Sequence, residues 1–158
     1  SNYPLVAIDT TQKYLNLMNK IANYNSKKFI YATWSYPNIL KNNNSSTPSS
    51  RAIEDKLEKI KPSADFDILP VGRAFDLFKL KYPNQTLFTS DNKHPNPIGC
   101  YLAACVIFSK ISNESSVGFP KRVFDKINNE KDIYYFIVEE EMARKCQLIA
   151  DEIVFDPN

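Results

Sequence analysis

Apolar side chains recur at helical spacing in the first part of the chain. They follow a short polar run in which Asp9 suits an N-cap and Gln12 suits the capping-box position three residues later. The apolar positions that repeat every three or four residues are Tyr14, Leu17, Met18 and Ile21. This stripe predicts an amphipathic helix.

Two short runs are rich in β-branched and aromatic residues. The first covers residues 29–34 and is followed by a turn-forming Tyr36-Pro37-Asn38 segment. The second covers residues 66–71 and ends at Gly72. Their length and composition favour two buried strands.

Apolar periodicity predicts further helices over residues 53–62, 73–81, 97–108 and 138–153. The third of these is almost wholly apolar, which is typical of a buried helix. Two polar segments separate the predicted elements. Residues 41–50 have the composition of a loop, and residues 112–131 show no clear pattern.

Strands and helices alternate along the chain, and this order predicts an α/β fold with a mostly parallel sheet covered by helices. Two strands are too few for such a sheet. Either further strands escape recognition, or part of the domain lies outside residues 1–158. The length of 158 residues fits a single domain.

Composition excludes several classes of site. Three glycines cannot supply a glycine-rich nucleotide-binding loop, and one His with three scattered Cys cannot build a His/Cys zinc site. We therefore expect no metal, no cofactor and no disulfide framework, with the cysteines as buried thiols. A net charge of +2 gives no indication of nucleic-acid binding. The lack of a long apolar run predicts that the chain has no membrane-spanning helix. The sequence does not indicate a compartment.

The single histidine lies in a polar, proline-rich segment three residues after an aspartate. Asp91 and His94 at this spacing can meet in a turn, where the carboxylate fixes the imidazole tautomer and leaves the second ring nitrogen for a substrate or nucleophile. Two plainer interpretations stay open. His94 can be an isolated surface residue, and Asp91 can accept backbone N–H groups at a helix start.

The surrounding residues resemble a known family. The resemblance rests on residues 68–75, on the block Asp91-x-x-His94-Pro95-x-Pro97-x-Gly99-x-Tyr101, on the apolar run to Phe108, and on Thr33-Trp34 and Val117-Gly118. Together they resemble the C-terminal part of SGNH (GDSL-type) hydrolases. The resemblance implies a three-layer α/β/α fold and ester hydrolysis by a Ser, His and Asp triad.

Carried over by residue, the resemblance makes Asp91 the triad acid and His94 the general base. Asn92 stands where the family usually has Gly, a mild departure because Asn tolerates a left-handed backbone. The larger departure is that nothing in the chain matches the family's nucleophile block or its oxyanion residues. This absence agrees with the low strand count and indicates that the nucleophilic Ser lies upstream.

Local serines are poor substitutes for that nucleophile. Ser90 adjoins Asp91 in sequence, which is not the geometry of a triad. The carboxyl ends of parallel strands share one rim, so Ser1, Trp34 and Ser35 can lie there together with the Asp91–His94 loop. We name Trp34 and Ser35 as candidate substrate-binding residues. A core Trp that caps the sheet is an equally valid interpretation of Trp34.

Two functions follow as hypotheses. The first is a serine-dependent carboxylic ester hydrolase acting on a small acyl ester or an O-acylated carbohydrate, with its N-terminal segment as a possible separate chain. On this hypothesis, residues 1–158 alone are inactive. The alternative is a non-catalytic SGNH-like binding module that lacks the nucleophile.

Overall fold

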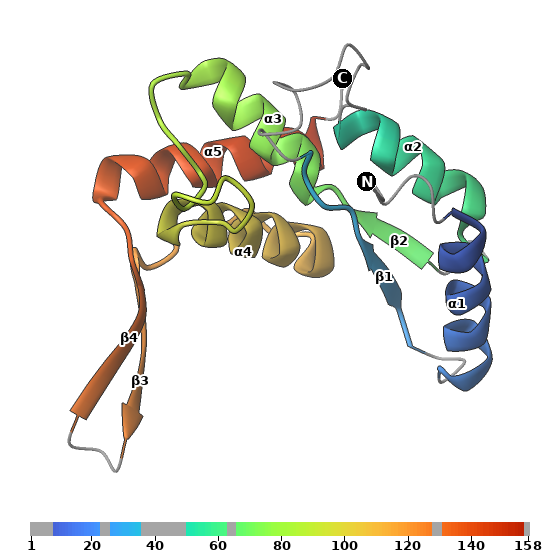
Figure 1. Cartoon of the computed structure of the whole chain (residues 1–158). Coiled ribbons are helices and arrows are strands. Elements are labelled where there is room, and N and C mark those ends of the chain that lie inside the picture. The colour runs from blue at the N-terminus through green and yellow to red at the C-terminus, as the bar shows by residue number, and fades with distance from the viewer. Residues whose placement is uncertain (1–7, 23–25, 36–49, 63–65, 128–130, 157–158) are drawn as a thin grey trace.

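The computed structural model describes residues 8–22, 26–35, 50–62, 66–127 and 131–156. These residues form a mixed α/β structure with five helices and four strands (Figure 1). In chain order the elements are α1 (Ile8–Ile21), β1 (Lys28–Tyr31), α2 (Ser50–Ile60), β2 (Phe66–Leu69), α3 (Val71–Lys81), α4 (Pro97–Ser112), β3 (Arg122–Ile127), β4 (Lys131–Ile137) and α5 (Glu140–Phe155). The predicted loop at 41–50 lies outside the described residues except for Ser50.

The two predicted strands pair in parallel, as the sequence indicates, with Ile30 opposite Ile68 and Tyr31 opposite Leu69. Side chains alternate across this small sheet. Ile30 and Ile68 face a cluster that includes residues of α1 and α2. Phe29 and Leu69 join the larger cluster with α3, α4 and α5. Helices therefore cover both faces of the sheet, which confirms an α/β architecture.

The chain leaves the sheet through a close approach between the end of β1 and the start of α3. The Gly72 N–H donates to the carbonyl oxygen of Ala32 at 2.9 Å, and the Ala32 N–H donates to Leu69 at 3.0 Å. A Cβ on Gly72 would lie 2.2 Å from the carbonyl oxygen of Thr33. Only glycine allows this contact, which fixes the direction in which the chain leaves β1.

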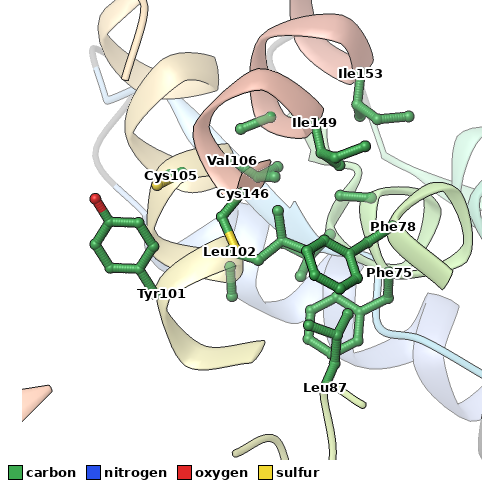
Figure 2. Close-up of a cluster of buried hydrophobic side chains, with 14 of the residues drawn as sticks. Phe75, Phe78, Leu87, Tyr101, Leu102, Cys105, Val106, Cys146, Ile149 and Ile153 are labelled. Atoms are coloured by element: carbon green, nitrogen blue, oxygen red, sulfur yellow. The ribbon is translucent and has the colours of Figure 1, made fainter. Parts of the chain in front are cut away.

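The larger hydrophobic core lies between α3, α4 and α5 (Figure 2). Its labelled side chains are Phe75, Phe78, Leu87, Tyr101, Leu102, Cys105, Val106, Cys146, Ile149 and Ile153. The predicted apolar helix and the predicted face of the last helix are confirmed. Burial raises the pKa of the Cys105 thiol to about 11 and that of Cys146 to about 12, so both stay neutral. Cys100 is only half-buried.

The helix α1 forms as predicted, but its apolar stripe is not buried. Asp9 lies in the first turn, one residue after the helix begins. Among the α1 side chains that the structure describes, Leu15 alone belongs to the sheet cluster. The four stripe residues are all exposed: Tyr14, Leu17, Met18 and Ile21. They point to a side of α1 that no described element covers. β1 likewise pairs only with β2 among the described residues, so its other edge is open there.

The segment between α4 and α5 is an antiparallel hairpin that the sequence analysis missed. β3 and β4 pair from Arg122 opposite Ile137 to Ile127 opposite Lys131, with an irregularity between Val123 and Phe124. Charged residues interrupt the strand pattern and give the segment its polar composition. The hairpin projects away from the helices (Figure 1). Its base is closed by the Val138 N–H, which donates to the Lys121 carbonyl at 2.9 Å.

In the part of the chain that the structure describes, no helix combines the length and hydropathy needed to cross a bilayer.

Candidate functional site

A short loop after α3 carries the candidate residues and returns the chain to α4. Its base is an antiparallel bridge between Phe88 and Pro95. Above the bridge, the Thr89 N–H donates to the carbonyl oxygen of His94 at 2.9 Å. Asn92 turns the tip with a left-handed φ of 55°. Asn tolerates this conformation better than most residues, so Asn92 suits the turn.

Asn96 connects this loop to α4 and is the N-cap that the sequence analysis missed. Its Oδ1 accepts the Gly99 N–H at 3.0 Å, and Pro97 occupies the first helical turn. An Asn directly before a proline that opens a helix is the signal that could have identified it. Gly99 is needed here because an added Cβ would lie 2.4 Å from the Leu87 carbonyl oxygen.

The Asp91 carboxylate is the centre of the loop. Its Oδ1 accepts the Thr89 hydroxyl at 2.7 Å, the Lys93 N–H at 2.8 Å and the His94 N–H at 3.0 Å. Its Oδ2 lies 2.5 Å from the His94 ring Nδ1. One carboxylate thus binds both the backbone and the imidazole. The backbone stretch it organises is the turn before α4, not the helix start.

These hydrogen bonds hold the pKa of Asp91 well below its usual range. The largest cause is the His94 N–H, followed by the Lys93 N–H, the Thr89 hydroxyl and the His94 ring. An ionised carboxylate only accepts hydrogen bonds, so Nδ1 of His94 must carry the proton between them. In a neutral imidazole this leaves Nε2 as an acceptor.

The imidazole lies at the surface. The His94 side chain is 79% exposed and the Asp91 side chain 43% exposed. Among the described residues, no hydroxyl is hydrogen-bonded to Nε2. We call the Asp91–His94 pair the dyad. Its carboxylate orients the imidazole, and the outer ring nitrogen, Nε2, is open to a group from elsewhere.

The structure brings Trp34 to this loop. Its indole Nε1–H donates to the carbonyl oxygen of Lys93 at 3.2 Å. The indole stacks on Phe75, with ring centroids 4.5 Å apart and planes 12° apart, and Phe88 meets it edge-on at 5.9 Å. Trp34 is half-buried, so it is both a sheet-capping aromatic and a neighbour of the dyad.

Ser35 lies beside Trp34 at the end of β1. Its backbone N–H donates to the hydroxyl oxygen of Ser50 at 3.3 Å. A cavity of about 280 Å³ touches Ser35, Trp34 and Asn92, and its other lining residues are Phe75, Asp76, Lys79, Pro83, Gln85, Thr86, Leu87 and Phe88. The strand end and the dyad loop therefore share this cavity, while His94 itself is not part of its lining.

No described contact joins Ser90 to the imidazole. Ser90 is exposed in the turn beside Asp91. Ser1 lies outside the described residues.

Two neighbours of the site were not singled out in the sequence. The Thr89 hydroxyl donates to Asp91 Oδ1. A Thr two residues before an Asp is a sequence signal for such a local turn contact. Tyr31 meets Trp34 edge-on at 6.4 Å, and burial together with the nearby Cys100 raises the pKa of Tyr31 to about 12. No sequence pattern marks Tyr31, since it reads as one more strand residue.

No group of three or more His, Cys, Asp or Glu side chains that could hold a metal ion occurs within the described ranges. Comparison of the chain with protein-family models, with curated proteins and with solved structures finds no match. The arrangement of the residues is therefore the basis for any functional assignment.

Proposed function

We propose that the chain forms the C-terminal part of an SGNH-type hydrolase domain and that the intact protein is a serine-dependent carboxylic ester hydrolase. The observation that carries this proposal is the 2.5 Å pair between His94 Nδ1 and Asp91 Oδ2, with the outer ring nitrogen exposed on a rigid loop. The resemblance of residues 68–108 to that family agrees with it. The nucleophilic Ser and the oxyanion donors belong to a segment upstream of residue 1.

The proposed chemistry follows from the dyad. His94 Nε2 takes the proton of the upstream Ser hydroxyl as its oxygen attacks the ester carbonyl carbon. The imidazolium that forms is stabilised by the ionised Asp91. It then returns the proton to the leaving alcohol oxygen, and the acyl-enzyme remains. A water molecule repeats the sequence, releases the carboxylic acid and restores the free Ser.

Two features of the fold support an upstream segment. β1 has an edge that no described strand pairs with, and such edges are normally covered or protected. The apolar side chains of α1 are also exposed. A strand added to β1, with its own side chains under α1, would cover both features at once.

The cavity beside Trp34 and Ser35 supports a small substrate. Its volume of about 280 Å³ is at the lower end of ligand pockets, which suits a short acyl group or one sugar ring. We therefore assign a small acyl ester or an O-acylated carbohydrate as substrate, with Trp34 and Ser35 on the binding rim.

Hydrolysis of p-nitrophenyl acetate and labelling with a fluorophosphonate test the proposal. A gene product that includes the upstream sequence should be labelled on Ser, and His94→Ala should lower its kcat by several orders of magnitude. Residues 1–158 alone should show no turnover that His94→Ala abolishes.

Two results would contradict the proposal. Turnover by residues 1–158 that depends on His94 would place the nucleophile inside this chain. A longer product that is neither labelled nor active would favour the non-catalytic module, since no described hydroxyl meets Nε2.

A further inference from the structure

The dyad loop is strongly organised from within. The hydrogen bonds to Asp91, the Phe88–Pro95 bridge and the Asn96 cap all lie inside the loop or run to the start of α4. They fix the shape of the loop and its attachment to α4. They do not connect it to the end of β1, where a substrate held at the sheet rim would lie.

The hydrogen bond from Trp34 makes that connection. It joins two residues 59 positions apart, the end of β1 and the peptide carbonyl of Lys93, at 3.2 Å. Lys93 also donates its own N–H to Asp91 at 2.8 Å, and the next residue is His94. The indole therefore bonds to one of the two residues that lie between Asp91 and His94.

The indole is itself held firmly. It stacks on Phe75 of α3, a buried residue of the main core, with centroids 4.5 Å apart. Phe88, at the base of the dyad loop, contacts both the indole at 5.9 Å and Phe75 at 5.6 Å. Because the indole is fixed in this way, its N–H group can set the position of the loop that it bonds to.

We infer that Trp34 is a positioning residue, which holds the Asp91–His94 pair at the carboxyl end of β1 through its indole N–H. It does not exchange a proton with the substrate. Its effect on turnover rests on the proposed function, whereas its effect on the geometry of His94 does not.

The chain offers clean probes, because it contains one His and one Trp. The Nδ1 proton of His94 and the indole proton of Trp34 can each be assigned by NMR without ambiguity. Trp34→Phe removes the N–H donor and keeps an aromatic ring on Phe75. Tyr31→Phe is the matched control, since it removes one polar hydrogen from the same aromatic cluster and has no hydrogen bond to the loop.

In Trp34→Phe, we expect exchange of the His94 Nδ1 proton with water to accelerate roughly threefold to tenfold, as the loss of one hydrogen bond predicts. In Tyr31→Phe the rate should not change. A rate in Trp34→Phe equal to that of the unmodified chain would overturn the inference. So would equal acceleration in both variants, because the cause would then be packing of the cluster.

A measurement on the unmodified chain covers the case in which Trp34→Phe fails to fold. The indole proton of Trp34 should be protected from exchange, and rapid exchange would overturn the inference. In an active longer product, Trp34→Phe should lower kcat. If that product is inactive, the proposed function fails, while the two NMR results still decide the role of Trp34.

Discussion

One carboxylate, Asp91, holds both the backbone and the ring of His94. The His94 N–H donates to Oδ1 at 3.0 Å, and the ring Nδ1 lies 2.5 Å from Oδ2. The shape of the loop and the orientation of the imidazole therefore have a common origin. A change at Asp91 should affect both together, which distinguishes this pair from a surface His that meets an Asp by chance.

Asp91→Asn should reverse the tautomer of His94. The amide oxygen can still accept the backbone N–H groups, but its NH₂ group then faces Nδ1 and donates to it. The neutral ring would carry its proton on Nε2, where it can no longer accept one. We expect ¹⁵N NMR of the single His to show this change. In a longer, active product, kcat should fall about 10⁴-fold, as it does when the Asp of a Ser-His-Asp triad is changed to Asn.

Ser90→Ala is the control for Asp91→Asn, since Ser90 is exposed beside the dyad. It should leave both the tautomer and the activity as they are. A loss of activity in Ser90→Ala without a change in the His94 signals would instead make Ser90 a candidate nucleophile.

The lowered pKa of Asp91 predicts how the loop responds to acid. The hydrogen bonds from the His94 and Lys93 N–H groups favour the ionised form, so the pKa is lower in the folded loop than in an unfolded one. The ionised Asp91 stabilises the folded loop fully at pH values above the ordinary Asp pKa of about 3.9. It is lost as the pH falls below that value and through the lower folded pKa.

Fluorescence of the only Trp can follow this acid response, because Trp34 is bonded to the loop. The emission should be constant from neutral pH to about pH 4 and should change only below the ordinary Asp range. Asp91→Asn should abolish the acid step. A step that persists in Asp91→Asn would assign it to other carboxylates.

Removal of the β3–β4 hairpin should leave the body folded. The Lys121 carbonyl and the Val138 N–H are already 2.9 Å apart, so a two-residue Asn-Gly turn can replace residues 122–137. None of the hairpin side chains that the structure describes belongs to either core cluster. We expect the midpoint of thermal unfolding to change by a few degrees at most.

Ile149→Ala gives the comparison for the hairpin deletion, because Ile149 is buried in the main core. This substitution should lower the free energy of unfolding by about 2–5 kcal/mol. A deletion variant that loses its cooperative transition, or is less stable than Ile149→Ala, would show that the hairpin is part of the folding unit.

The sequence predicted the elements better than their surroundings. Parallel pairing of the two strands, the apolar helix and the Asp91–His94 contact depend on local spacing, and all are present. The burial of the stripe Tyr14, Leu17, Met18 and Ile21 depends on what covers it, and no described element does. Charges at Asp125 and Lys126 hide the alternation of the hairpin strands. Asn96 precedes the apolar run of α4, so the apolar pattern does not mark it.

Two leucines of α1 provide a direct test of what covers that helix. Leu15 is 9% exposed and packs on the sheet, whereas Leu17 is 46% exposed. In residues 1–158, Leu15→Ala should lower the free energy of unfolding by about 2–4 kcal/mol, and Leu17→Ala should lower it by about 0.5 kcal/mol or less. At about 2–4 °C per kcal/mol for a chain of this size, thermal unfolding separates the two.

In a longer product, the proposed upstream segment would bury Leu17, and Leu17→Ala should then become nearly as costly as Leu15→Ala. The same substitution thus gives two results in two contexts, and the difference measures the added burial. If Leu17→Ala stays neutral in the longer product, the upstream segment does not pack under α1. The open edge of β1 would then have to be covered from another direction, and the proposed completion of the sheet beside α1 would be wrong.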